Sequence, residues 1–220
     1  MKPVRIRKKE EILEKVINYP NGDTYNGQVV NDKKEGIGAY TYQSGARYEG
    51  QFQGDVKHGR GLYYFTNGDM MVANWQNDAL QGQVVYRFAN GDQYEGDVLN
   101  NQIHGKGIYR YHNKNIYEGE FQNGQPHGKG NFTYAEGGRY SGEWVNGKRH
   151  GQGVLSYGDG NGYEGGWLND QRSGKGRQVF ANNEQFFGEW KNNKKNGDGI
   201  YLYANGTREE GRWQNDVKIS

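Results

Sequence analysis

The sequence predicts an all-β fold: an elongated, twisted, single antiparallel β-meander of about eight β-hairpin repeats, preceded by a short N-terminal extension. Three observations lead to this prediction. An aromatic residue or a methionine recurs every 23 residues, glycine stands two positions after it in nearly every copy, and turn pairs such as Asn67-Gly68 recur between apolar segments. A fixed period of this size is the signature of a repeat array, in which each repeat packs on its neighbours.

Eight complete repeats follow one another without an insertion or a deletion. We number the positions of each repeat from its opening residue, which is position 1. The opening residues are Tyr25, Tyr48, Met71, Tyr94, Tyr117, Tyr140, Tyr163 and Phe186, and a partial repeat opens at Glu209. Because residues 17–22 match the second half of a further repeat, we expect about 17 strands in all.

Positions 1, 3 and 5 describe a first strand with one buried face. Position 3 is glycine in every complete repeat except the third, which has Ala73, and position 5 is always apolar. Alternation with a period of two is typical of a half-buried strand. The predicted aromatic face consists of Tyr48, Phe52, Trp75, Tyr94, Tyr117, Phe121, Tyr140, Trp144, Tyr163, Trp167, Trp190 and Trp213.

Positions 14, 16 and 18 describe a second strand, in which position 14 is glycine in all repeats but one and position 18 is always aromatic. We expect the glycine to leave a flat patch of backbone on which a ring can lie. Asn-Gly pairs such as Asn90-Gly91 favour tight turns between antiparallel strands, so each repeat should be a hairpin. Isolated hairpins are marginal, and stability must come from stacked neighbours.

The chain has 220 residues, a net charge of +2 and no cysteine, which excludes a disulfide framework and a thiolate metal site. No apolar segment approaches the roughly 20 residues of a membrane-spanning helix. We therefore expect an intracellular protein, cytoplasmic or cytoskeletal. The expected division is a basic N-terminal extension at 1–15, the repeat array at 16–213 and a C-terminal tail at 214–220. Residues 10–15 could form one or two helical turns.

The charges also follow the repeat. Basic residues gather at positions 9, 10 and 13, around the hairpin loop, and acidic residues at positions 2 and 4, on the face opposite the rings. The predicted basic edge consists of Lys33, Lys34, Lys57, Arg60, Lys106, Lys129, Lys148, Arg149, Arg172, Lys175, Lys194 and Lys195. This edge could be solvated surface, or it could bind acidic proteins or anionic lipid headgroups. The acidic back face argues against nucleic acid as a partner.

The third repeat departs from the pattern. Met70, Met71 and Val72 replace the usual charged strand, and Val84 replaces a glycine. Methionine-rich surfaces adapt to different partners, so this segment could dock a partner. It could instead be a local aliphatic part of the core, which is the interpretation we favour.

No catalytic, cofactor-binding or metal site is predicted. Four of the five histidines, His58, His104, His127 and His150, occupy position 11. Successive repeats would hold them about 10 Å apart, whereas the ligands of one zinc ion lie about 2 Å from it. We expect these histidines to structure the loops. No pair of titratable groups stands out from the repeating background, so we do not expect an enzyme.

One repeat reads YEGEF at residues 117–121, NG at 123–124 and HGKG at 127–130. This pattern resembles the MORN repeat, and the resemblance extends over residues 16–213. A nearly pure MORN chain is most similar to the small radial spoke head proteins of cilia. The resemblance implies a non-enzymatic structural subunit of an axonemal complex, which binds other subunits, another MORN chain among them, through its repeat surface. The alternative is a peripheral membrane-associated cytoskeletal scaffold that binds anionic phospholipids through its basic edge.

Overall fold

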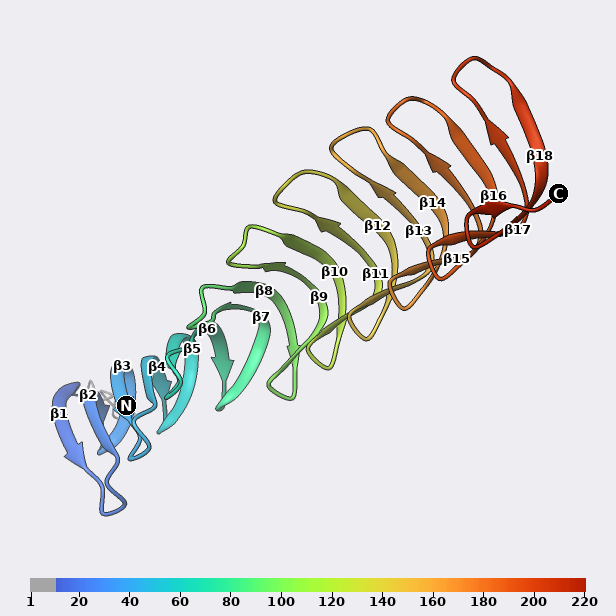
Figure 1. Ribbon diagram of the computed structural model, residues 1–220. Coiled ribbons are helices and arrows are strands. Elements are labelled where there is room, and N and C mark those ends of the chain that lie inside the picture. Colours follow the sequence, from blue (N-terminus) through green and yellow to red (C-terminus); the bar gives the residue numbers. More distant parts are fainter. Residues whose placement is uncertain (1–10) are drawn as a thin grey trace, which may run out of the picture. The chain divides into compact units, whose positions relative to one another are not determined.

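The computed structural model describes residues 11–220, and in this part of the chain every regular element is a β-strand (Figure 1). The chain divides into two compact units, residues 1–98 and residues 99–220. The boundary falls at the end of the first strand of the fourth repeat. Residues 1–10, which hold the basic start of the predicted extension, lie outside the described residues.

In the first unit each strand pairs antiparallel with the next strand along the chain. The first and last of these strands do not pair with each other in the described residues, so the sheet is open. The strands are β1 (Leu13–Asn18), β2 (Thr24–Val30), β3 (Lys33–Thr41), β4 (Arg47–Gln53), β5 (Val56–Tyr64), β6 (Met70–Gln76), β7 (Ala79–Arg87) and β8 (Gln93–Leu99).

The second unit repeats this arrangement, again with each strand antiparallel to the next. Its strands are β9 (Gln102–Arg110), β10 (Ile116–Gln122), β11 (Gln125–Thr133), β12 (Arg139–Val145), β13 (Lys148–Ser156), β14 (Gly162–Leu168), β15 (Gln171–Val179), β16 (Gln185–Lys191), β17 (Lys194–Leu202), β18 (Arg208–Gln214) and β19 (Val217–Lys218). The predicted all-β antiparallel meander is confirmed.

The tight hairpin turns lie at a different place from the one expected. In the third repeat β6 ends at Gln76 and β7 begins at Ala79, so positions 7 and 8 form a two-residue loop. Both loop residues, Asn77 and Asp78, have positive φ angles of 51° and 64°. A tight turn of this kind requires positive φ at both central residues, which Asn and Asp tolerate. The Asn67-Gly68 pair instead lies in a longer connection, in which the Phe65 N–H donates to the Asp69 carbonyl and the Gly68 N–H donates to the Phe65 carbonyl.

A β-bulge in each hairpin determines which side chains share a face. In the second repeat Gly50 pairs with Gly61, and after the bulge Phe52 pairs with Lys57. The bulge contains Gly59, whose φ of +58° suits glycine. Side chains of directly opposed residues lie on the same face of a sheet. The position-10 side chain therefore faces the rings, although the residue lies beside the hairpin loop.

The core of most repeats is a tyrosine ring on a glycine floor. Tyr48 is fully buried, and its hydroxyl donates a hydrogen bond of 3.0 Å to the backbone oxygen of Gln51. A Cβ added to Gly61 would lie 2.4 Å from Tyr48 Cε2, and one added to Gly50 would lie 2.5 Å from the hydroxyl oxygen. Any side chain at either glycine would displace the ring. The glycine pattern is therefore a direct consequence of ring packing.

The third repeat shows that the glycines can be replaced where no ring opens the repeat. Met71 replaces the ring and is buried, with 6% of its surface exposed. The two glycines that a ring would require are replaced by Ala73 and Val84, which are also buried. A flexible thioether chain leaves room for these side chains. Met71 thus belongs to the core, in agreement with the favoured interpretation.

Three expectations about the ends of the array need correction. Residues 13–15 belong to β1 and not to a helical turn, because they pair with β2 as the second half of a repeat. Val217–Lys218, in the predicted tail, pairs with β18. The described residues therefore form 19 strands and not about 17.

Candidate functional site: the two faces of the repeats

The twelve residues of the predicted aromatic face are all buried. The most exposed of them is Trp75 at 8%. Within one unit they meet edge to face, as Tyr48 and Trp75 do at a centroid distance of 5.7 Å and an interplanar angle of 85°. Such pairs add to the stability that burial gives. These rings hold the repeats together and leave little surface on which a partner could bind.

A second set of rings, at positions 16 and 18, is only partly buried. In the first unit these rings form one unbroken row with centroid separations of 4.5–6.0 Å. The row consists of Tyr19, Tyr40, Tyr42, Tyr63, Phe65, Tyr86 and Phe88. In the second unit two shorter rows are separated by Leu155 and Gln178. The predicted aromatic face does not include these residues, although the constant ring at position 18 marks them.

The predicted basic edge is divided between different faces. Its position-10 members, Lys34, Lys57, Arg149, Arg172 and Lys195, lie over rings. The Lys57 Nζ atom, for example, lies 4.6 Å from the Trp75 ring centroid. Cation–π attraction of this kind contributes about 0.5–2 kcal/mol, depending on desolvation. Burial lowers the pKa of both Arg172 and Lys195.

A carboxylate or amide of the following repeat holds each of these five cationic residues in place. The backbone N–H of Lys57 donates to Asp78 Oδ1 at 2.9 Å, and the backbone N–H of Asp78 donates back to Lys57 at 3.0 Å. Position 8 supplies the corresponding acceptor for the other four cationic residues. Arg149 also forms an ion pair with Asp170 at 3.0 Å. We call this arrangement the loop clamp.

The remaining basic residues do not form an edge either. Lys129 is opposite Glu143, and Lys175 is opposite Glu189, on the face away from the rings. Asp198 is opposite Arg212, with the charges reversed. The face is therefore mixed in charge where an acidic one was expected. Position-9 residues such as Lys148 remain exposed beside the loop. Whether any of these residues binds a partner stays a prediction.

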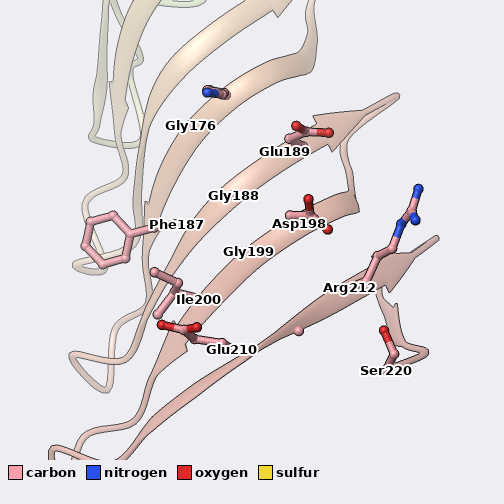
Figure 2. Close-up of a pocket in the computed structure, with 12 residues that line it drawn as sticks. Gly176, Phe187, Gly188, Glu189, Asp198, Gly199, Ile200, Glu210, Arg212 and Ser220 are labelled. Atoms are coloured by element: carbon pink, nitrogen blue, oxygen red, sulfur yellow. The ribbon is translucent and has the colours of Figure 1, made fainter.

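The mixed face is hollowed at the end of the second unit. A depression of about 900 Å³ has a floor formed by glycine backbone, including Gly188 and Gly199, and Figure 2 shows the residues that line it. One wall carries charged side chains such as Glu189 and Arg212, and the other carries Phe187 and Ile200. Phe187 is 38% exposed, which is unusual for a ring of this size. The depression offers a shallow amphipathic surface.

The candidate docking segment is split between the two faces. Met71 points into the core, as described above. Val72 lies on the opposite face, where it pairs with Leu62 of β5 and Val85 of β7. Met70 is opposite Tyr64 and also lies there. This apolar stripe is half-buried by its own neighbours.

The turns at the other end of the hairpins are linked by carboxylates. Asp23 accepts hydrogen bonds from the Tyr40 hydroxyl at 2.7 Å and from the Gln43 backbone N–H at 2.8 Å. These hydrogen bonds hold the pKa of Asp23 below its usual value, and the bond from Tyr40 has the largest effect. Asp69 makes the same contacts two turns further along, with Tyr86 and Ala89. Each such carboxylate ties one repeat to the next.

The histidines at position 11 do not come together. No group of three potential metal ligands is found among residues 11–220. The Nδ1 atoms of His58, His127 and His150 are buried without a hydrogen-bond partner. Their imidazoles pack within the hairpins without forming the hydrogen bonds at Nδ1 that a loop-structuring role would suggest. In the described part of the chain, no helix suited to crossing a membrane was found.

Comparison with known families identifies the repeat. The model of the MORN repeat matches residues 25–47, 48–70, 73–93, 94–116, 117–139, 140–162, 163–185 and 186–208. The chain is a MORN-repeat protein. These eight matches have the repeat boundaries that the sequence predicts, except in the third repeat, where the match begins at position 3. The comparison with curated proteins found no match.

Solved structures with the same fold include a domain of a different protein. The TCP10 domain of Danio rerio CPAP is similar to the MORN chain with a TM-score of 0.54 at 11% identity, over 93% of this chain and 98% of that domain. A mutant of the same domain gives a TM-score of 0.53 at 11% identity, over 93% and 97%. At this identity the likeness concerns the fold alone.

Proposed function

We propose that this MORN protein is a non-enzymatic structural subunit of a ciliary axonemal complex, with the radial spoke head as the first candidate. In this role it binds other subunits through its repeat surface. The observation that carries the proposal is the continuity of the repeat. Eight MORN repeats follow one another with an unbroken 23-residue period between residues 25 and 208, and such arrays present extended surfaces to partners.

The use of polar groups supports the same proposal. The tyrosine hydroxyls, the position-10 cations and the turn carboxylates are engaged in bonds that join strands and repeats. The surface left for recognition consists of the half-buried rings and the mixed-charge face with its depression. Surfaces of this kind suit protein subunits better than anionic membranes, since five of the twelve predicted basic residues lie on rings.

Detergent extraction of cells that express the tagged protein tests this proposal. Retention in the axonemal fraction, with release only by high salt or chaotrope, is the expected result. Release with the membranes would contradict the proposal and favour the phospholipid-binding scaffold. In that case the purified protein should also bind vesicles rich in anionic lipid, with an affinity that falls steeply as salt rises.

A further inference from the structure

A second depression lies beside the loop end of the last two complete repeats, on the face away from the rings. Its volume is about 730 Å³, and it is lined by parts of β14 to β18 together with Ile219. It adjoins the depression of Figure 2, with which it shares Lys175, Glu189 and Arg212. We call it the basic depression.

Changes from the repeat pattern account for this hollow and for its charge. Position 11, which is histidine in four other repeats, is Ser173 in the seventh repeat and Asn196 in the eighth. Position 6 is lysine only at Lys191, and position 4 is basic only at Arg212, in the partial ninth repeat. Side chains smaller than imidazole thus leave space at the same place where the array gains two cations.

The lining carries an excess of positive charge. Its cations are Lys175, Lys191 and Arg212, and its one carboxylate is Glu189. All four side chains belong to exposed residues, and within residues 11–220 none of them takes part in a hydrogen bond or an ion pair. Asp198, which is opposite Arg212, also forms no ion pair in this part of the chain. Three cations therefore stand against one carboxylate in a hollow that is open to solvent.

The eighth hairpin, which crosses the basic depression, places two like charges opposite each other. Lys191 on β16 pairs directly with Lys194 on β17. Like charges at directly opposed positions destabilise a sheet. The corresponding pair in the fifth repeat is Gln122 with Gln125, and no other pair at these positions within residues 11–220 holds two charges of the same sign. An anion bound beside the two ammonium groups would offset this repulsion.

We propose that the basic depression binds a phosphorylated segment of a partner protein. A phosphate ester carries a charge of about −1.5 to −2 at neutral pH and three strong acceptor oxygens. The Arg212 guanidinium can donate two parallel hydrogen bonds to such a group, and the side-chain amides of Asn192 and Asn196 are further donors in the lining. The inference goes beyond the proposed function, because it does not depend on the assembly to which the chain belongs.

The rest of the lining favours a protein segment over a lipid headgroup. Leu168 and Ile219 are 50% and 56% exposed and provide apolar surface beside the cations. The side chains on either side of a phosphorylated residue can bury this apolar surface, which a headgroup would leave in water. The expected partner segment therefore has apolar residues next to its phosphorylated residue.

Nuclear magnetic resonance titration tests the proposal with a defined probe, a phosphoserine tripeptide with leucine on either side and blocked ends. We expect saturable shifts of the backbone amide signals of Asn192 and Asn196. The signals of Gln122 and Gln125, in a hairpin without these cations, should stay unchanged, and the unphosphorylated tripeptide should shift neither pair. Equal shifts with the unphosphorylated tripeptide, or no shift at Asn192 and Asn196, would overturn the proposal.

Two double variants distinguish the basic depression from general charge attraction. Lys191→Gln with Arg212→Gln introduces the residue that other repeats have at these positions, so the fold should be kept. This variant should weaken phosphopeptide binding by at least about tenfold, which the loss of one charge-assisted hydrogen bond would cause. Lys129→Gln with Lys148→Gln removes the same charge from exposed sites elsewhere in the second unit and should leave the affinity nearly unchanged. Equal weakening by both variants would contradict the assignment.

The single variant Lys191→Gln provides a readout without any ligand. At low salt it should melt at a higher temperature than the wild type, because its repulsion with Lys194 is removed. The phosphopeptide should then stabilise the wild type more than the variant. A lower melting temperature of the variant without ligand would contradict the role assigned to the lysine pair.

Two other probes separate a protein segment from other sources of phosphate. Inorganic phosphate that bound as tightly as the tripeptide would assign the basic depression to the free ion and overturn the partner assignment. Vesicles of phosphatidylcholine with phosphatidylinositol bisphosphate are the second probe. If they bound the wild type but not the Lys191→Gln, Arg212→Gln variant, while the tripeptide bound neither, the depression would be a membrane site and the proposal would be wrong.

Discussion

At the scale of single residues, the ring of each opening tyrosine and the two glycines beneath it form one packing element. Gly61→Ala would place a Cβ 2.4 Å from Tyr48 Cε2. Because the ring is fully buried and its neighbours are backbone, relief requires a shift of the strand. We expect a loss of about 1–3 kcal/mol in the free energy of unfolding, as for other overpacked sites. Denaturant unfolding of the variant measures it.

The third repeat supplies the control for this prediction. It combines a methionine in place of the ring with alanine and valine in place of the glycines. Tyr48→Met should therefore relieve most of the clash in the Gly61→Ala background. The double variant should be less destabilised than the sum of the two single variants. Strict additivity would show that the ring and the glycine act independently.

Tyrosine ionisation provides a second prediction at this scale. Burial raises the pKa of Tyr25, Tyr48 and Tyr163 to about 12. Their ordinary pKa is about 10, and a pKa raised on folding means that the neutral form is favoured in the fold. The stability from these groups is complete below pH 10 and is lost as the pH rises towards 12. Ultraviolet titration should show tyrosinate appearing together with loss of β-sheet circular dichroism. Ionisation near pH 10 with the sheet intact would contradict the role of these rings.

At the scale of strands, the links between repeats are unequal within the second unit. The junction between the fifth and sixth repeats has Gly147 at the loop clamp and Gly138 at the position of the turn carboxylate. Other junctions of this unit use Asp170 or Asn193 at the loop and Asn161 at the turn. The side-chain hydrogen bonds that join neighbouring repeats are thus absent at both ends of the fifth and sixth hairpins.

Hydrogen exchange should reveal this weaker junction. We expect the amides of β11 and β12 to exchange faster than those of β15 and β16, because local opening breaks fewer bonds there. The Pro126→Lys, Gly147→Asp variant should slow the exchange of β11 and β12 and leave β15 and β16 unchanged. Uniform exchange across the four strands in the wild type would show that backbone pairing alone controls opening.

Much of this element-level structure could be predicted from sequence, because the period and the alternation fix strand order and the buried face. The position of the tight turn could not, since an Asn-Gly pair indicates a turn without specifying its class. The five position-10 residues were assigned to the basic edge for a related reason. A bulge at position 12 turns the side chain at position 10 towards the rings. The alternation of polar and apolar residues does not reveal this bulge, so the sequence pattern alone places the charged side chain in solvent. The spacing of position 10 and position 8 of the next repeat does carry a signal for the pairing of Lys57 with Asp78.

At the scale of the whole molecule, a repeat array should tolerate changes that keep its period. Removal of residues 140–162, one complete repeat by family match and by register, leaves equivalent strand partners on both sides. We expect the shortened chain to keep its β-sheet circular dichroism with a modest loss of stability, because one set of neighbour contacts is lost.

A deletion that breaks the period is the matched control. Removal of residues 140–150 would join the end of the fifth repeat to the middle of the sixth. The strands on either side would then no longer have equivalent partners, and the following side chains would be out of register. That chain should fail to fold. If both deletions gave equally stable proteins, or if neither folded, the repeats could not be the independent packing elements that the structure describes.

The role of the array as an axonemal subunit is tested most directly by site-specific cross-linking in isolated axonemes. The chain has no cysteine, so Gln125→Cys introduces a single thiol at an exposed site beside the hairpin loop of the fifth repeat. A thiol-reactive photo-cross-linker on this residue should join the protein to one axonemal subunit in constant ratio. The same probe on Asn182→Cys, at an exposed turn, should not give that product. Failure to recover the labelled protein with axonemes, or the absence of any cross-linked subunit, would contradict the structural role.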